Sequence, residues 1–455
     1  MSSLRFGQKV NPFLVILAVI CAIALAFDGN HIAFLFVAIF FLLIIGAPVA
    51  IALGGASLLF VLISGKVPDL VVVHRMVNGI DSFPLLAVPF FILAGTLMNA
   101  VGITNRIFAF ATACVGWMHG GLGHVNIGAS IIFAGMSGAA VADAGGLGTI
   151  EIKAMRDAGY DADFSVGVTA ASSTIGPIIP PSLPMVIYGV MASASIGQLF
   201  AAGFIPGLLM GVALMLMVAW FAHRRKYPRD AEFSVSVLGS SFKRAFLSLT
   251  TPIIIVGGIL TGMFTPTEAA TAAVLWAMFL GFVVYRTLNL RRFVRVSMET
   301  IETTAIILLI VAGASIFAWL LTSNRVTEQF ANLVSGFTDN KFLILILLNL
   351  ILFIVGFFME TVAAITILVP VLLPLAVSVG VDPVHFGVIM VLNLMIGLLT
   401  PPVGMVLYVL SRVSGVSFER CTQATLPFLI PLVAVLMLIT FVPEFSMWLP
   451  TLIYR

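Results

Sequence analysis

The chain has 455 residues, of which 61% are hydrophobic and only 9% charged, with a formal net charge of +3. Soluble domains carry roughly 25% charged residues, so this composition excludes a soluble protein and predicts a polytopic membrane protein without a separate soluble domain. The small net charge gives no case for nucleic-acid binding, and three cysteines without CxxC spacing give little support for a metal, disulfide or redox role.

Apolar runs recur from residue 12 to residue 449, and about ten to twelve of them approach the ~20 residues that span a bilayer. The first run, residues 12–27, follows Arg5 and Lys9 and is predicted to be an extra, retained N-terminal helix within residues 1–30. The small residues at Ala24-Leu25-Ala26 leave a cleaved signal peptide as the alternative.

From residue 31 onward the sequence contains one internal repeat at an offset of about 220 residues. Four short motifs recur in the same order in both halves, and two proline-rich stretches close the series. The matched motifs are Gly46-Ala47-Pro48 with Phe264-Thr265-Pro266, Ala94-Gly95-Thr96 with Ala312-Gly313-Ala314, Asn105-Arg106 with Asn324-Arg325, and Gly135-Met136-Ser137-Gly138 with Gly356-Phe357-Phe358-Met359. The first repeat is predicted to cover residues 31–222 and the second residues 246–455.

Charge orients the two repeats. The segment 223–245 is the densest basic stretch and is predicted to be a cytoplasmic linker, and the arginines within 286–295 mark a second cytoplasmic loop. When the spans are counted from these cytoplasmic loops, the span after Pro48 ends outside the cell and its counterpart after Pro266 ends inside. The repeats are therefore predicted to be inverted, an arrangement that lets one site face either side of the membrane.

Each repeat is predicted to contain the same series of helical elements. Two spans are followed by an amphipathic connector along the interface, a third span, a re-entrant helical hairpin, a broken helix and a final span. The connectors are residues 66–82 and 286–300, the third spans 83–104 and 301–322, the hairpins 125–155 and 343–378, and the final spans 201–222 and 424–442.

Two stretches, Gly176 to Tyr188 and Gly397 to Tyr408, place glycine and consecutive prolines inside apolar runs. Proline lacks a backbone N–H and clashes with the preceding turn, so the helix breaks there and frees carbonyl groups. Such breaks are tolerated at membrane depth only where they are buried in protein or line a polar cavity. A matched pair in the two halves of a chain indicates a transporter binding site.

Asp143 in the first hairpin and Glu360 in the second lie close to the repeat distance from each other and are predicted to be near-equivalent. An ionised carboxylate in the membrane is costly unless it is paired or coordinates a cation, which favours a functional role. The alternative is that each one accepts a hydrogen bond from a backbone N–H or pairs with an arginine, and serves only folding. Glu268, near a helix N-terminus, is predicted to be structural.

Hydroxyl groups beside the breaks, together with freed carbonyls and the hairpin tips, offer the oxygen ligands of a sodium site. The alternative role of these serine and threonine residues is to cap the half-helices. The candidate sodium ligands are Ser137, Gly138, Asp143, Ser172, Ser173, Thr174, Gly176, Gly356, Glu360, Thr361, Asn393, Gly397 and Thr400. The half-helix N-termini after each proline pair favour an anionic substrate. The candidate substrate-binding residues are Pro181, Ser182, Pro402, Val403 and Gly404.

Other patterns argue against catalysis. The sequence has no P-loop motif, which disfavours ATP-driven transport by this chain alone, and no GxSxG or HExxH pattern supports an enzyme. We therefore predict no catalytic residue, no cofactor and no metal other than sodium. His119 and His124, beside a glycine-rich turn, are predicted to be loop or capping residues, and Arg106 and Arg325 to reach the interface from the ends of spans.

With these motifs the sequence resembles the large membrane subunit of the tripartite ATP-independent periplasmic (TRAP) transporters, within the ion-transporter superfamily. The resemblance runs from about residue 31 onward and is strongest at Pro89 to Gly95, Ser137 to Asp143, Gly176 to Tyr188 and Thr400 to Gly404. Two positions differ from the family pattern, because Ala139 stands where a serine is usual and Glu360 where an aspartate is usual.

The resemblance implies sodium-coupled uptake of a small organic anion, of carboxylate or sialic-acid type, across the bacterial inner membrane. A periplasmic binding protein would deliver the anion, and a small four-helix membrane subunit would brace the scaffold. The expected topology has a cytoplasmic N-terminus and a periplasmic C-terminus.

The resemblance also implies an elevator mechanism, in which the hairpins and broken helices move as one unit. The transport parts would be residues 107–200 and 326–411, and the scaffold parts residues 31–106 and 246–325. The alternative hypothesis is a self-sufficient ion-coupled anion exchanger or channel that needs no binding protein.

Overall fold

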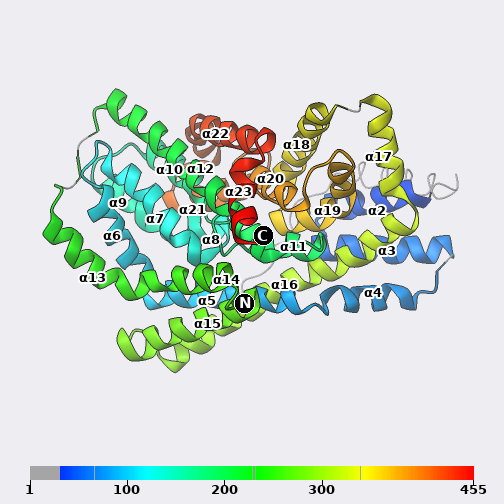
Figure 1. The fold of residues 1–455 in the computed structure, drawn as a ribbon, viewed down its shortest axis with the longest axis horizontal. Coiled ribbons are helices and arrows are strands. Elements are labelled where there is room, and N and C mark those ends of the chain that lie inside the picture. The colour runs from blue at the N-terminus through cyan, green and yellow to red at the C-terminus, as the bar shows by residue number, and fades with distance from the viewer. Residues whose placement is uncertain (1–30, 66, 228, 231, 339, 455) are drawn as a thin grey trace. The chain divides into compact units, whose positions relative to one another are not determined.

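The computed structural model describes residues 31–65, 67–227, 229–230, 232–338 and 340–454, so the predicted extra helix within residues 1–30 lies outside the described residues. Within these ranges every regular element is helical, as predicted, and eight helices are long and apolar enough to cross a membrane (Figure 1). The described residues divide into two compact units, one made of those up to residue 82 with 305–333, and the other of 83–304 with those from 334 onward. The scaffold and transport boundaries stay a prediction, because this division does not report which parts move.

The smaller unit is built from short apolar helices. Gly46 adopts a φ of +90° in the turn before Pro48, which caps the next helix. Gly313 allows two helices to touch, because a methyl group there would lie 2.9 Å from the carbonyl oxygen of Ala50. The elements are α2 (His31–Ile44), α3 (Val49–Ser64), α4 (Leu70–Ile80), the second part of α16 (Leu290–Ser323) and the first part of α17 (Val326–Phe337).

The two predicted connectors differ in the structure. The first is helix α4, which ends at Ile80 and is followed by the short 3-10 helix η1 (Phe83–Leu86) and α5 (Ala87–Val101). The second is not a separate helix, because α16 begins at Leu290 inside the predicted connector and continues without interruption through the predicted third span. Pro84 interrupts the first segment, whereas residues 286–323 contain no proline, so nothing stops α16.

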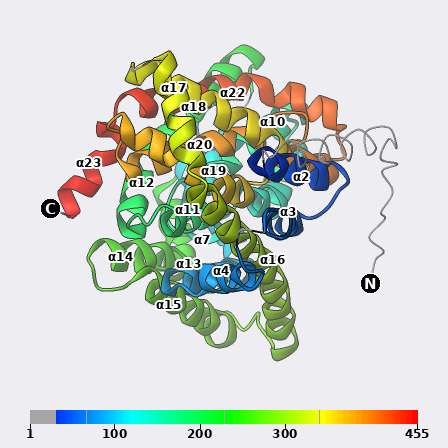
Figure 2. The same ribbon diagram turned by 90° about the vertical axis from the view of Figure 1, so that its right-hand side faces the viewer.

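The larger unit contains both helical hairpins and both broken helices, which confirms these elements of the prediction (Figures 1 and 2). The first hairpin is α7 (Gly121–Ser137), α8 (Ala140–Gly145) and α9 (Leu147–Asp157), and the second is α18 (Lys341–Phe358) and α19 (Thr361–Ser378). The broken helices are α10 (Ala162–Ser173) with α11 (Leu183–Met191), and α20 (Pro383–Gly397) with α21 (Met405–Ser414).

The broken helices form the core of this unit. Every residue of α10 from Phe164 onward and every residue of α20 from Val384 onward is buried. A helix that is apolar on all sides is stable only when it is enclosed on all sides. The hydroxyl and amide groups of α10 and α20 are therefore removed from both lipid and bulk water.

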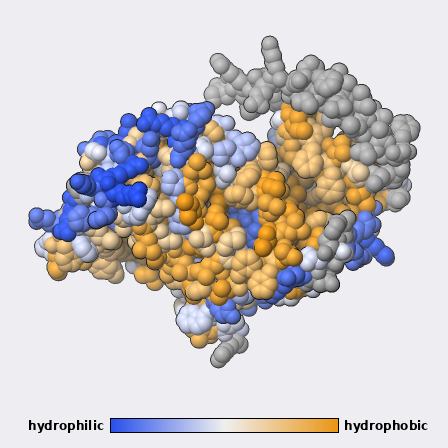
Figure 3. Space-filling model, turned by 90° about the horizontal axis from the view of Figure 1, so that it is seen from above, coloured by the Kyte–Doolittle hydropathy of each residue, from blue (hydrophilic) through white to orange (hydrophobic). Residues whose placement is uncertain are grey.

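Further helical elements surround this core. Helix α12 is capped by Ser195 and extends into the predicted basic linker, and α13 begins inside that linker at Val235. The surrounding elements are α6 (Ile103–Val115), α12 (Ile196–Arg225), α13 (Val235–Pro252), the π-helix η2 (Ile253–Gly257), α14 (Gly258–Leu260), α15 (Pro266–Phe279), the π-helix η3 (Leu280–Val284), α22 (Phe418–Phe441) and α23 (Glu444–Ile453). In Figure 3 hydrophilic side chains gather at the left of the view, the end at which Figure 1 places α9 and α13.

Candidate functional site

The tip of the first hairpin touches the first break. Gly138 forms the tip with a φ of +60°, a left-handed conformation that favours glycine. A methyl group on Gly138 would lie 3.0 Å from the carbonyl oxygen of Pro181 and 3.3 Å from the backbone nitrogen of Leu183. Glycine at the tip therefore lets the backbone of the hairpin approach the unwound segment between α10 and α11.

The second repeat has the same arrangement. A methyl group on Gly397 would lie 2.7 Å from the carbonyl carbon of Gly356, so the two glycines bring α18 and α20 into backbone contact. Val403, in the second break, donates its N–H to the carbonyl oxygen of Phe357 at 3.2 Å. In both breaks the peptide bond between the two prolines is cis.

Contacts between the repeats follow the same symmetry. The first arm of each hairpin packs on the first half of the broken helix in its own repeat, α7 on α10 and α18 on α20. The second arm packs on the second half of the broken helix in the other repeat, α8 on α21 and α19 on α11. Figure 2 shows α18, α19 and α20 together, with α11 beside α19. The two halves therefore interlock in the way that an internal pseudo-two-fold repeat requires.

A buried asparagine links each hairpin to its half-helix. Asn126 of α7 donates to the Thr169 hydroxyl at 2.7 Å and accepts from the Ser172 hydroxyl at 2.5 Å. In the second repeat, Asn393 of α20 donates to the side-chain oxygen of Asn349 of α18 at 2.8 Å and to its carbonyl oxygen at 3.0 Å. These bonds fix the register of each hairpin against its broken helix.

Asp143 lies in α8, where it is 2% exposed; its carboxylate oxygens meet the hydrogen-bond criteria with no described residue, and the buried Ser130 hydroxyl is the side-chain donor beside them. The first break passes beside it, since a methyl group on Gly176 would lie 3.7 Å from Asp143 Oδ2. A second buried carboxylate, Glu151 of α9, is 1% exposed and close enough to Asp143 to repel it when both are ionised. This local charge favours a bound cation.

The predicted equivalence of Asp143 and Glu360 is wrong. Glu360 is the N-cap residue of α19, and its carboxylate accepts hydrogen bonds from the backbone N–H groups of Val362 at 2.9 Å and Ala363 at 3.2 Å. The N-cap position of α8 is held by Ala139, and Asp143 lies one turn further into the helix. The physical reason is that the repeat aligns the two hairpin tips and the N-cap residues that follow them. Glu360 is itself an N-cap residue, whereas Asp143 lies one turn after one, so the two carboxylates are not equivalent.

The other candidate ligands divide into two groups. Ser173, Thr174 and Thr400 donate their hydroxyl groups to carbonyls of the preceding helical turn, at 2.8, 2.6 and 3.0 Å. By contrast, the Thr361 hydroxyl and the Asn393 side-chain oxygen are buried without a hydrogen-bond partner in the described part of the chain. Ser137 is the last residue of α7.

The candidate substrate residues lie at the two breaks. Ser182 caps α11, accepting from the N–H of Met185 at 3.2 Å and donating to the carbonyl of Pro177. Gly404, with a φ of +55°, holds the N-cap position of α21, directly after Pro402 and Val403. The carbonyl of Pro177, within the first break, therefore accepts a hydrogen bond from Ser182 and is not free.

A cavity of about 240 Å³ lies beside the first tip and the first break. Gly138, Pro181 and Leu183 form one wall, and residues of α5 form the other, among them Thr96 and Asn99. The cavity therefore joins the N-terminus of α11, the positive end of that helix's dipole, to polar side chains of a surrounding helix. Pro402, Val403 and Gly404 do not line it.

Comparison with known proteins then identifies the family. The sequence model of the family described as the tripartite ATP-independent periplasmic transporter, DctM component, matches residues 36–445. The chain belongs to the large permease family of TRAP transporters. It is therefore a multi-pass membrane protein of a family of transporter permeases.

Several relatives of this TRAP permease are similar over most of their length. The sialic acid TRAP transporter large permease protein SiaM of Vibrio cholerae is 50% identical over 411 residues, 90% of this chain and 96% of that protein. The C4-dicarboxylate TRAP transporter large permease protein DctM of Pseudomonas aeruginosa is 38% identical over 401 residues, 88% of this chain and 93% of that protein.

The fold is similar to that of a solved transporter. The YdaH transporter of Alcanivorax borkumensis, described as having an unusual topology, superposes with a TM-score of 0.56 at 16% sequence identity. The match covers 82% of this chain and 88% of that chain, and at this identity it supports the fold alone.

Sequence reasoning missed five polar residues of this permease. Asn126 and Asn349 lie in apolar helices close to the repeat distance from each other, and that spacing was the signal that could have found them. Thr96 is the last residue of a motif used to define the repeat, and Asn99 lies one turn further along the same helix, but neither was assigned to the site. Glu151 gave no such signal, because it reads as part of a charged helix end, and only its burial distinguishes it.

Proposed function

We propose that this chain is the large subunit of a sodium-coupled TRAP transporter that imports a small organic anion of carboxylate or sialic-acid type. One observation carries the proposal: in both repeats a hairpin tip contacts a break in a buried helix, and unpartnered buried oxygens lie beside these contacts. Half-helices with exposed N-termini and freed carbonyls are the arrangement by which secondary transporters hold anions and coupling cations.

Two cation sites are proposed, one in each repeat. Asp143, near Gly176, supplies two buried oxygens in the first repeat. In the second repeat Thr361, the first residue of α19, and Asn393, one turn before Gly397 in α20, supply one each. Buried oxygens without hydrogen-bond donors are costly to desolvate, and a bound cation would offset that cost.

The proposed substrate site is the cavity between the first tip and α5. The positive end of the α11 dipole, after Pro181, would attract an anionic group in this cavity, and Asn99 and Thr96 supply polar contacts. A carboxylate suits this site, and the named relatives include permeases for sialic acid, C4-dicarboxylates and 2,3-diketo-L-gulonate, as well as one for isethionate.

The proposed partners are a periplasmic binding protein, which delivers the anion, and a small four-helix membrane subunit. The proposed motion is an elevator movement in the bacterial inner membrane. The relatives are named as permease proteins of TRAP transporters, so they do not favour the alternative of a self-sufficient exchanger. Uptake by the purified chain without a binding protein would support that alternative.

The test is sodium-driven sialic acid uptake into proteoliposomes containing this chain, its small subunit and its binding protein. Asp143→Asn keeps the shape of the side chain and removes its charge, so we expect sodium-dependent uptake to fall at least tenfold, equivalent to about 1.4 kcal/mol. The matched control is Asp157→Asn, an exposed aspartate at the end of the same hairpin, which should transport normally. Unchanged sodium dependence in Asp143→Asn, with normal protein levels, would remove Asp143 from the proposed site.

A further inference from the structure

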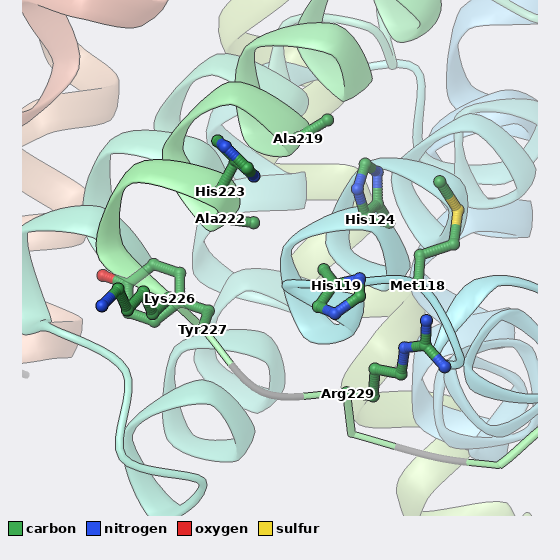
Figure 4. A pocket seen from close by; sticks show the side chains of 9 residues that line it. All are labelled: Met118, His119, His124, Ala219, Ala222, His223, Lys226, Tyr227 and Arg229. Atoms are coloured by element: carbon green, nitrogen blue, oxygen red, sulfur yellow. The ribbon is translucent and has the colours of Figure 1, made fainter.

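A cavity of about 760 Å³ lies between the start of α7 and the end of α12, away from both tips and breaks. Five nitrogen-bearing basic side chains line it, and no acidic residue does. They are His119, His124, His223, Lys226 and Arg229. Figure 4 shows the three histidines around the space between α7 and α12, with Lys226 on one side and Arg229 on the other. The lining therefore has the chemistry of an anion site.

His124 indicates that a ligand belongs in this cavity. His124 lies in the first turn of α7 and is 1% exposed. Neither of its ring nitrogens has a hydrogen-bond partner among the described residues. Buried polar atoms are nearly always paired, and an unpaired one calls for an explanation. An anion in the cavity would supply the missing acceptor for an imidazole N–H.

The cavity is held open by the segment after α12. Asp230 accepts hydrogen bonds from the N–H of Leu122 at 2.8 Å and from the hydroxyl of Tyr160. Burial raises the pKa of Tyr160, and the hydrogen bond to Asp230 raises it further, so this hydroxyl stays protonated and remains a donor. An antiparallel backbone bridge joins His119 to Arg229. These bonds place the Arg229 side chain beside α7 before any ligand arrives.

Aromatic residues next to the cavity place it at the depth of the lipid headgroups. Trp117 is 43% exposed and packs edge-on against Phe233, which is 56% exposed. Trp220, near the end of the apolar helix α12, is 49% exposed and carries the guanidinium of Arg224 over its ring at 4.7 Å. Exposed tryptophans with adjacent cations are typical of the membrane–water interface.

We propose that this cavity binds a phosphate group, with Lys226 and Arg229 supplying positive charge from opposite sides and His124 donating a hydrogen bond. Basic pockets between membrane helices hold phospholipid headgroups, and arginine is well suited to phosphate oxygens. The phosphate belongs to an anionic phospholipid or to a soluble phosphate, since the same groups recognise both. This site is separate from the proposed transport site and does not depend on it.

The test uses the full chain purified in detergent, with bound lipid counted by native mass spectrometry. One arm titrates phosphatidylglycerol, with phosphatidylcholine of the same acyl chains as comparison, and the other titrates inorganic phosphate and follows the thermal unfolding temperature. The variant is the double substitution Lys226→Gln with Arg229→Gln, both exposed side chains. At about 1 kcal/mol for each cation, we expect about 30-fold weaker binding.

The matched control is Arg291→Gln with Arg295→Gln, two exposed arginines of α16 that remove the same charge and line no part of this cavity. Loss of phosphatidylglycerol binding in the first variant alone supports the proposal with a lipid ligand. Loss of an inorganic-phosphate effect in that variant alone supports it with a soluble ligand. Equal losses in both variants, or no loss in either, would overturn it, and a monodisperse elution profile checks that each variant is folded.

Discussion

Backbone N–H groups at the start of α19 donate hydrogen bonds to the carboxylate of Glu360. Asp143 lies one turn inside α8, and no backbone N–H of the described residues donates to its carboxylate. A capping carboxylate is satisfied by its own helix and benefits from the helix dipole. A carboxylate inside the helix must find its partner elsewhere. The position of each residue relative to its helix start therefore separates the two acids more sharply than their burial does.

Glu360 is expected to contribute to stability as a cap. Replacement by alanine removes the acceptor for two N–H groups and should lower the free energy of unfolding by about 1 kcal/mol. Glu360→Asp should retain most of this energy, because aspartate is itself a preferred cap. Thermal unfolding in detergent measures both variants, and equal losses in the two would contradict the capping role.

Gly397 is expected to tolerate no side chain. The Cβ of alanine would lie 2.7 Å from the backbone of Gly356, which cannot move without shifting the second hairpin. We expect Gly397→Ala to lower stability by about 1–3 kcal/mol, the range for overpacked cores. Gly239→Ala is the control, because nothing lies within 4 Å of its new methyl group. Similar unfolding temperatures for the two variants would show that this contact is loose.

At the scale of elements, the two asparagine links explain how a hairpin keeps its register on a broken helix. The half-helices α10 and α20 are buried on all sides and held by close packing, which is not directional. Hydrogen bonds between fixed polar atoms add directional contacts that suit one register. Each repeat uses one asparagine of its hairpin for this purpose, Asn126 or Asn349.

Loss of either asparagine link is expected to be costly. Asn126→Ala leaves the hydroxyl groups of Thr169 and Ser172 without their side-chain partner, and Asn349→Ala does the same to the amide of Asn393. Each should cost about 1–3 kcal/mol. Asn78→Ala is the control, since Asn78 is exposed and makes only long contacts of 3.4 Å to His74. Urea or thermal unfolding of the three variants measures the difference in stability. Equal stabilities would mean that the buried amides do not help to hold each hairpin in register on its broken helix.

At the scale of the whole molecule, the sequence predicts that the repeats are inverted. Loop charge carries that prediction, through the basic linker and the arginines that follow α15. The contacts of hairpins with broken helices are what two interlocking repeats require. They do not by themselves assign the sides of the membrane.

Single cysteines test the inversion. In a chain without its native cysteines, Asp69→Cys before α4 is expected to react with a membrane-impermeant maleimide in intact spheroplasts. Arg291→Cys at the start of α16 should react only after the membrane is opened. Both side chains are exposed, so access to the reagent decides the result. Labelling of both from the same side would disprove the inverted topology.

The sequence by itself determined the membrane class, the repeat, the two hairpins and the two breaks. These features follow from local physics, because apolar length sets a span and proline ends a helix wherever it occurs. The same local signal failed at α16, where the predicted connector and span form one helix because no residue there interrupts it.

Only the tertiary structure decided which polar groups are left for a ligand. Hydroxyl groups of Ser173, Thr174 and Thr400 are used within their own helices, whereas oxygens of Asp143, Thr361 and Asn393 are not. The cavity beside α5 likewise joins residues far apart in the chain. Whether a polar atom is satisfied depends on neighbours brought by folding, and a sequence pattern read along one helix does not contain them.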